Sequence, residues 1–137
     1  MDAHKNISGM LRVTEKLSKV RNDFEVWFIG DGDPAPYIKT AKDLNIYKSF
    51  AFFDGAKTTS QVAEIMRNSH CFLLFSNYEN LPCVMVEALA SGIPIVSSTA
   101  GGIHEHITDN FGLLMKPSDE PALLIALNTA IDNIKAA

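Results

Sequence analysis

Two carboxylates, Glu79 and Glu87, are the side chains of this sequence whose spacing best suggests chemistry. They stand eight positions apart, and Glu87 is the single charged residue in the run Leu81–Ala90, where every other residue is apolar or proline. A buried charge without a partner costs several kcal/mol or loses its ionisation. An acid in such a run therefore needs a partner or a ligand. A carboxylate accepts two hydroxyl hydrogen bonds side by side, which suits the vicinal diol of a ribose or a sugar.

The elements around the two acids place both at one edge of a sheet. An apolar strand is predicted at Cys71–Phe75, and Glu79 lies on the loop that follows it. The next helix has Pro82 in its first turn and ends at Gly92. Glu87 lies about one and a half turns into this helix, and its Cα–Cβ bond tilts back toward the helix start. Both acids can thus face the crevice at the carboxyl ends of the strands.

The start of the same helix offers backbone donors to a ligand. The N–H groups of Asn80, Leu81 and Cys83 precede or begin it, and such groups suit an anion. Amides for phosphate, flanked by acids for hydroxyls, indicate a nucleotide-sugar site. The alternative is equally open at this point: Glu87 pairs with a basic side chain and Glu79 is a solvated loop acid.

Short, continuously apolar strands alternate with helices along the rest of the chain, which predicts a parallel sheet covered by helices on both faces. The fold class is therefore α/β, a Rossmann-like doubly wound domain that spans residues 1–137. The predicted strands are Phe24–Gly30, Ser49–Gly55, Cys71–Phe75, Pro94–Ser98 and Gly112–Lys116. Besides the helix of Glu87, the predicted helices are Asn6–Val20, Tyr37–Leu44, one that Thr59 or Ser60 caps and that ends near Arg67, and one after Ser118 that runs through Leu123 to Ile134.

The chain opens on a helix, whereas doubly wound domains usually begin with a strand. We therefore expect a fragment whose first strand is missing. In the strand order 3-2-1-4-5-6 that strand lies between the predicted strands Phe24–Gly30 and Cys71–Phe75. Because exposed central edges are not tolerated in a soluble domain, we expect these two strands to close up against each other or to be completed by another chain in a homodimer.

Composition excludes several classes of partner. The 137 residues carry 16 acidic and 12 basic side chains, a net charge of −4, and contain no basic block, which argues against nucleic acid. No apolar run reaches the roughly 18 to 20 residues that span a bilayer, and no signal peptide is visible. Cys71 and Cys83 have neither metal nor redox spacing, so we expect buried thiols in a reducing, cytoplasmic compartment.

Two other motifs offer alternative interpretations to a site at Glu79 and Glu87. The run Gly30–Ala35, "GDGDPA", fits the G-x-G-x-x-A dinucleotide fingerprint, with Asp54 at about the distance of a ribose acid. Asp31 and Asp33, however, would place two negative charges where a pyrophosphate must sit. The same pair forms a D-x-D, the pattern with which another class of sugar transferases holds a metal, but solvated turn acids are the better interpretation.

No metal site is predicted. On a helix, the rings of His104 and His106 point about 200° apart, so one metal could not take both. We expect surface or capping roles for all four histidines. Paired glycines, Gly101 and Gly102, follow the strand Pro94–Ser98 and let the backbone approach a ligand, although a plain tight turn is equally compatible with them.

The segment "SNYENLPCVMVEALASGIPIVSSTAGGIHE", Ser76–Glu105, resembles the E-x7-E signature region of retaining glycosyltransferases of family 4, which have two Rossmann-like domains in the GT-B arrangement. The likeness covers nearly the whole chain. The stretches "HKNISGMLRV" and "VWFIGDGD" resemble the family's first helix of the C-terminal domain and its second strand and turn. "FAFFDGAKTTSQVAEIMRNSHCFLLFS" resembles the next two strands, and "NFGLLMKPSDEPAL" the final strand and helix.

The resemblance implies a role for each matching residue. Glu87 matches the acid that holds the ribose diol of the donor, and Glu79 matches the catalytic-site acid near the transferred sugar. Asn80 to Cys83 match the loop whose amides meet the sugar and the phosphates. Lys5 matches a lysine that neutralises the diphosphate. No metal and no cofactor beyond the nucleotide sugar is implied.

Two further positions match the family, and three departures stand beside them. Phe53 and Gly55 match the strand end near the base. Asn80 stands where the family often has glycine, and Phe75 replaces the proline usual before the motif serine. The arginine that accompanies the lysine would lie upstream of Met1, as would the acceptor-binding N-terminal domain.

The resemblance thus implies the donor-binding domain of a metal-independent retaining enzyme. Its parent would be a hexosyltransferase that moves a sugar from a nucleoside diphosphate sugar to a glycan or lipid acceptor in polysaccharide biosynthesis. We expect the parent in the cytoplasm or peripheral to the inner face of the membrane, and this chain alone to transfer no sugar. One alternative is a nucleotide-sugar epimerase of similar fold. Another is a receiver-like module, which would need a lysine where Ser97 and Ser98 stand.

Overall fold

A computed structural model describes residues 5–30, 32–76, 88, 90–99 and 112–136 of the chain. Its helices are α1 (Ile7–Ser18), α2 (Ala35–Asp43), α3 (Thr59–Arg67) and α5 (Glu120–Ala136). Its strands are β1 (Val26–Ile29), β2 (Ala51–Asp54), β3 (Phe72–Leu74), β4 (Ile95–Ser98) and β5 (Gly112–Met115). Each of the predicted strands is found and is shorter than predicted by one to three residues in total. Helix and strand alternate as predicted, so the α/β assignment is confirmed.

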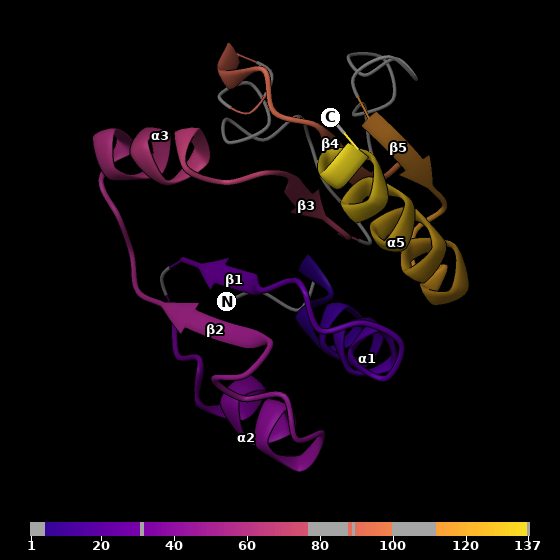
Figure 1. The fold of residues 1–137 in the computed structure, drawn as a ribbon. Helices are drawn as coiled ribbons and strands as arrows, with labels where there is room; N and C mark the ends of the chain where they lie inside the picture. Colours follow the sequence, from indigo (N-terminus) through magenta and orange to yellow (C-terminus); the bar gives the residue numbers. More distant parts are fainter. Residues whose placement is uncertain (1–4, 31, 77–87, 89, 100–111, 137) are drawn as a thin grey trace.

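The strands form two parallel sheets. β1 pairs with β2 in one sheet, and β3, β4 and β5 pair in that order in the other. In Figure 1, α1 and α5 lie side by side on one side of the strands, while α3 lies on the opposite side. This is the doubly wound arrangement, in which helices cover both faces of parallel strands.

The two sheets share one hydrophobic core on the side of α1 and α5. Leu11 and Leu17 of α1 are buried there together with Phe28 of β1, Val96 of β4 and Leu123 of α5. Apolar side chains recur along α1 at the spacing of one helix face, which is why this helix turns that face inward. The shared core holds the two sheets in one body.

Local details of two helices differ from the sequence interpretation. α2 begins at Ala35 rather than at Tyr37, because Pro34 sets the backbone for the first turn. α3 is capped by Thr58, not by Thr59 or Ser60. The Thr58 hydroxyl accepts from the Gln61 N–H at 3.2 Å, and the Gln61 side chain accepts from the Thr58 N–H at 2.9 Å. This reciprocal pair is a capping box, which satisfies two backbone donors at once.

The end of the helix predicted around Glu87 is partly described. Residues 88, 90 and 91 are helical, and Gly92 follows them with φ 73°. A left-handed residue after the last turn is the usual way in which a helix ends, and glycine adopts it without strain. The predicted end at Gly92 is confirmed, whereas the start of this helix lies outside the described residues.

Of the two outcomes expected for the edges of β1 and β3, one is wrong: these strands do not close up against each other, and no pairing joins the two sheets in the described part of the chain. The other outcome, completion by another chain in a homodimer, has no support here and stays a prediction. The helices hold the sheets together instead. α5 packs on β4 and β5, and α1 lies beside α5 and shares its core with β1. The two sheets thus form one body through their helices and core rather than through pairing of β1 with β3.

Candidate functional site

The edge at which the parallel strands end is where three of the predicted site residues lie. Lys5, Phe53 and Gly55 are described by the structure. The other predicted site residues, which are Glu79, Asn80, Leu81, Cys83, Glu87, Gly101 and Gly102, lie outside the described residues. The site can therefore be built from the β1–β2 side and from the first residues after β3 and β4.

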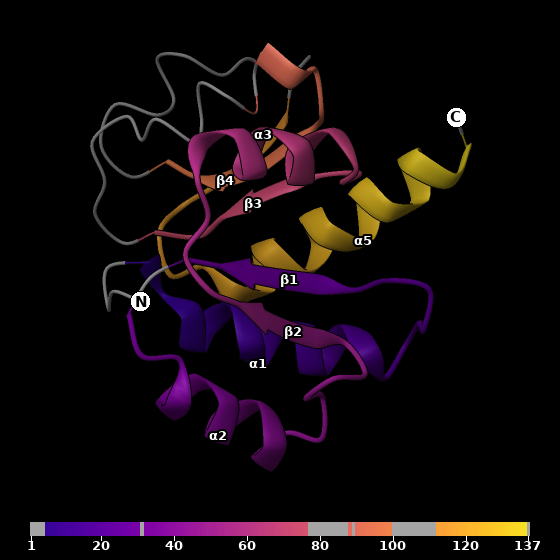
Figure 2. The same ribbon diagram turned by 90° about the vertical axis from the view of Figure 1, so that its left-hand side faces the viewer.

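Lys5 is brought to this edge by the start of α1. Asn6 caps the helix with φ 53°, and its side chain accepts from the Gly9 N–H at 3.2 Å. A Cβ on Gly9 would meet that side chain at 2.7 Å, so the glycine is needed for the cap. α1 runs against the direction of β1, which places its first turn where β1 ends (Figure 2). Lys5 and Gly30 accordingly line the same cavity.

A second lysine reaches the same edge from β2. Lys57 forms an ion pair with Asp54 at 2.9 Å, and the Gly55 N–H donates to the other carboxylate oxygen at 2.9 Å. Lys57 first, and the Gly55 N–H second, lower the pKa of Asp54 from its ordinary value. Lys57 and Asp54 line the cavity that Lys5 and Gly30 also line. The sequence interpretation missed Lys57, although a lysine two residues after a strand-ending glycine was a signal for it.

Glycines occupy the ends of both strands on this side, and packing does not require either of them. Gly30 follows β1 and Gly55 follows β2. A Cβ built on either residue meets no described atom within 4 Å, and neither residue has a left-handed φ. The described part of the fold therefore leaves room for a side chain at both places. A ligand that touches the backbone is a reason for glycine that packing does not supply.

Phe53 contributes to the core rather than to the edge. Its ring stacks on Phe28 with centroids 5.0 Å apart, and the Tyr47 ring centroid lies 6.5 Å away. The side chain is thus held among apolar groups of the α1 and α2 side. The backbone of Phe53, rather than its side chain, therefore lies next to the end of β2.

The acid of the competing dinucleotide and D-x-D interpretations, Asp33, is held in a turn. Its carboxylate accepts from the Ala35 N–H at 3.0 Å at the start of α2, and the residue is exposed. This is what a solvated turn acid does. Its partner Asp31 lies outside the described residues.

Hydrogen bonds from two serines of β4 stabilise the other part of this edge, where β3 and β4 end. The Ser98 hydroxyl donates to the Ser76 carbonyl at 2.7 Å, and both residues are fully buried. The Ser97 hydroxyl donates to the Ser98 carbonyl at 2.8 Å. Ser76 is the first residue of the segment that carries Glu79 and Glu87, so its backbone is fixed to the end of β4. Sequence reasoning missed this contact, because nothing local links positions 22 residues apart.

Other chemistry is limited in the described residues. No group of three His, Cys, Asp or Glu side chains could hold a metal ion there. Within the same ranges, every helix is too short or too polar to cross a membrane. Cys71 is a free thiol whose pKa is raised to about 11 by burial, so it is inert at neutral pH.

Comparison with known proteins gives consistent matches. The family described as glycosyl transferases group 1 matches residues 1–137. The Vi polysaccharide biosynthesis protein VipC/TviE of Salmonella typhi is 37% identical over 78 residues, which are 56% of this chain and 13% of that protein. The putative glycosyltransferase EpsF of Bacillus subtilis is 31% identical over 115 residues, which are 83% of this chain and 29% of that protein. The chain thus spans less than a third of either relative.

Solved structures agree on the fold. The crystal structure of HepE from Anabaena in complex with UDP-glucose superposes with a TM-score of 0.86 at 20% identity. The match covers 98% of this chain and 38% of that one. The likeness shows a shared architecture, a Rossmann-like half of a GT-B fold.

Proposed function

Because the chain belongs to the glycosyl transferases group 1 family, we propose that it is the donor-binding domain of a retaining glycosyltransferase of family 4. The whole protein transfers a sugar from a nucleoside diphosphate sugar to a glycan or lipid acceptor. No transfer is expected from this chain alone, since the acceptor is held by a domain beyond it. The reaction proceeds without a metal or a further cofactor.

One observation carries the proposal. At the edge where β1 and β2 end, Lys5 and Lys57 line the same cavity beside two glycines whose packing leaves room for a side chain. Cations beside a glycine backbone that a ligand can approach closely suit a diphosphate, because its oxygens carry charge and accept hydrogen bonds. Lys5 would face the diphosphate, and the backbone of Phe53 and Gly55 would lie beside the base.

The remaining roles follow from the segment after Ser76. Glu87 would accept the two ribose hydroxyls, and Glu79 would lie beside the transferred sugar. The amides of Asn80 to Cys83 would meet the sugar and the phosphates, and Gly101 and Gly102 would let a further backbone approach. The Ser98–Ser76 hydrogen bond supports this assignment, because it fixes the start of the segment at the carboxyl edge.

The decisive experiment titrates nucleoside diphosphates and the matching nucleosides into the chain by calorimetry. We expect the diphosphates to bind more tightly than the nucleosides, and addition of EDTA to leave the affinity unchanged. Lys5→Met should weaken diphosphate binding by about tenfold, as the loss of one charge-assisted contact. Lys39→Met, at an exposed position of α2, is the matched control and should change nothing. Equal affinity for nucleoside and diphosphate would contradict the proposal.

The ribose assignment has a test of its own. Glu87→Ala should lose about 2 kcal/mol or more of nucleotide affinity, since it removes the acceptor of charge-assisted hydrogen bonds. Asp43→Ala, at an exposed position of α2 outside the cavity lining, is the control. If both variants bind the nucleotide as the wild type does, Glu87 does not hold the ribose.

A further inference from the structure

The ion pair of Asp54 and Lys57 places a carboxylate in the cavity where the diphosphate is proposed to bind. Lys57 Nζ lies 2.9 Å from Asp54 Oδ2, and both residues line the cavity that Lys5 also lines. A carboxylate repels a phosphate, and Lys57 offsets that repulsion. The presence of Asp54 therefore needs a reason other than the diphosphate. A neutral part of the ligand that donates hydrogen bonds would supply one.

Asp54 and Lys57 are held in position by the protein's own contacts. The Gly55 N–H donates to Asp54 Oδ1 at 2.9 Å, which fixes the carboxylate at the end of β2. The capping box of Thr58 and Gln61 fixes the backbone directly after Lys57. The Asp54 side chain is nevertheless 44% exposed and the Lys57 side chain 23%, so a ligand can reach both. A pair that is already ordered loses little conformational entropy when a ligand binds.

Both side chains keep hydrogen-bonding capacity beyond these contacts. A carboxylate offers about four lone-pair positions, and an ammonium group offers three donors. In the described part of the chain, Asp54 accepts one contact on each oxygen, and Lys57 uses one donor in the ion pair. The pair thus presents a donor group beside two oxygens that can each accept once more.

Among the nucleotide bases, guanine has the edge that complements this pair. Its O6 accepts a hydrogen bond, and the adjacent N1–H and N2 amino group both donate. Uracil presents a single N–H between two carbonyl oxygens, so one of these oxygens would face the carboxylate, acceptor against acceptor. Adenine has one donor group beside an acceptor nitrogen. A polar group that is left facing the wrong partner costs affinity.

The position of the pair agrees with the reach of a nucleotide. Asp54 is paired in register with Ile29, at the end of the strand next to β2. Lys5 and Gly30 line the cavity at the end of β1, one strand step of about 4.8 Å away. Side chains at paired positions of neighbouring strands lie on the same face, so Ile29 offers an apolar contact to the ring of a base at Asp54.

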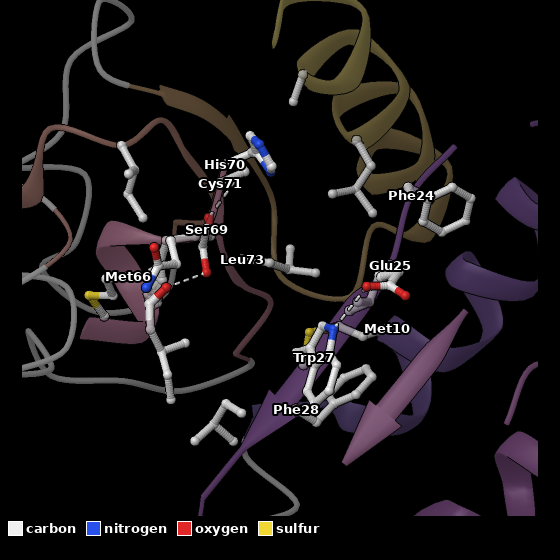
Figure 3. A pocket seen from close by; sticks show the side chains of 18 of the residues that line it. Met10, Phe24, Glu25, Trp27, Phe28, Met66, Ser69, His70, Cys71 and Leu73 are labelled. Carbon is white, nitrogen blue, oxygen red and sulfur yellow. Dashed lines mark hydrogen bonds between the residues drawn. The ribbon is translucent and has the colours of Figure 1, made fainter. Parts of the chain in front are cut away.

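The remainder of the cavity suits a base less well. Figure 3 shows its interior, where Phe28 and Leu73 present apolar side chains. Glu25 is the labelled carboxylate there, just before β1 and thus at the opposite end of that strand from Gly30. It accepts from Trp27 Nε1 at 3.3 Å. An indole has one N–H, which is used in this contact, so the Glu25–Trp27 pair lacks the donor that O6 of guanine needs.

We propose that the Asp54–Lys57 pair selects guanine, so that the donor substrate is a GDP-linked sugar. Asp54 accepts hydrogen bonds from N1–H and from the N2 amino group of guanine, and Lys57 donates to O6. The selection rests on the proposed function, since it requires the diphosphate to lie at the Lys5 end of the same cavity. The pair acts on binding and takes no part in the transfer of the sugar.

The test compares GDP, inosine diphosphate, ADP and UDP by calorimetry on this chain. All four have the same diphosphate, so differences in affinity report on the base. We expect GDP to bind about tenfold or more tightly than ADP and UDP, since a hydrogen bond to a charged group contributes about this factor. Inosine diphosphate lacks only the N2 amino group, so its affinity should lie between those of GDP and UDP.

Three variants locate the selection. Asp54→Asn keeps the shape but replaces one acceptor oxygen with a donor, so it should weaken GDP binding by about tenfold and leave UDP binding equal or tighter. A variant that had lost its fold would bind neither nucleotide. Lys57→Met should weaken GDP and inosine diphosphate alike, since both present O6. Asp43→Asn, at an exposed position of α2 outside the cavity lining, is the control and should keep the preference for GDP.

The outcomes separate the guanine assignment from the donor-binding function. If GDP, ADP and UDP bind equally well, and each more tightly than its nucleoside, the guanine assignment is wrong and the donor-binding function stands. The guanine assignment is also wrong if UDP binds most tightly, or if Asp54→Asn retains the full preference for GDP. If no diphosphate binds more tightly than its nucleoside, both assignments fail.

Discussion

The strands β4 and β1 are alike in length and direction but opposite in the relation between composition and burial. Ile95–Ser98 of β4 is half polar, yet all four residues are buried. Val26–Ile29 of β1 is wholly apolar, yet its burial is partial. β4 has a strand on each edge, whereas β1 has one in the described part of the chain. The number of neighbours, more than side-chain polarity, decides how deeply a parallel strand is covered.

The polar residues of β4 also show what burial demands. Ser97 and Ser98 can be fully buried because each hydroxyl donates to a backbone carbonyl. A buried hydroxyl without such a partner would cost about 1–3 kcal/mol. The same requirement applies to the edge of β1 that has no strand partner in the described part of the chain.

The largest expected effect contrasts two isoleucines. Ile95→Ala in β4 should lower the free energy of unfolding by about 2–5 kcal/mol, because it opens a cavity at a fully buried position. Ile29→Ala in β1 should cost less than half as much, since that side chain is only partly buried. Urea denaturation of both variants measures the difference. Equal losses would show that β1 is as well covered in solution as β4.

The next effect concerns the segment that connects the two sheets. Thr58→Ala removes the side-chain half of the α3 capping box and should cost about 1 kcal/mol. Thr59→Ala, one position on, is the matched control and should lie within about 0.5 kcal/mol of the wild type. Chemical denaturation distinguishes the two variants. A larger loss of stability in Thr59→Ala would show that Thr58 is not the residue that caps α3.

A smaller effect depends on pH, through ion pairs that join the entry of β1 to α5. Asp23 pairs with Arg21 at 2.7 Å and with Lys135 at 2.6 Å, and Arg21 also pairs with Asp132 at 2.9 Å. Arg21 first, and Lys135 second, hold the pKa of Asp23 well below its usual range. A carboxyl group whose pKa is lower in the folded than in the unfolded protein stabilises the fold at pH values above its unfolded pKa of about 4. This stabilisation is lost as the pH falls below that value.

The corresponding measurement compares unfolding at pH 7 and pH 3. The wild type should lose more stability on acidification than Asp23→Asn does, because the variant has no carboxylate to protonate at this position. Asp43→Asn, at an exposed residue of α2, should follow the wild type. If acid destabilises wild type and Asp23→Asn alike, the pairs contribute nothing between the β1 entry and α5.

Local patterns predicted the elements well, since apolar runs and the turn residues between them lie close in sequence. The spacing of apolar residues in Ile7–Leu17 predicted α1, and Gly92 predicted the end of a helix. What escaped prediction depends on residues far apart in the chain, such as the Ser98–Ser76 hydrogen bond and the Arg12–Glu120 pair at 2.7 Å between α1 and α5.

The candidate site was likewise predicted only in part. Lys5 was placed by resemblance and lies at the predicted edge. Lys57, which lines the same cavity, was missed because its position comes from the end of β2 rather than from a motif. The sequence predicted that β1 and β3 lack a common neighbour. The closing up of these two strands, which was one of the two outcomes expected from it, does not occur in the described part of the chain.

The smallest expected effect on stability is at Gly55, where the β1–β2 sheet meets the proposed donor. Gly55→Ala adds a methyl group that meets no described atom within 4 Å, at a residue without a left-handed φ. The free energy of unfolding should therefore change by less than about 0.5 kcal/mol. Gly9→Ala is the contrasting variant, because its Cβ would meet the Asn6 side chain at 2.7 Å and disturb the cap of α1. If Gly55→Ala keeps full stability but loses nucleoside diphosphate affinity, the glycine is there for the ligand. If both stability and affinity are unchanged, the end of β2 is not a contact of the donor.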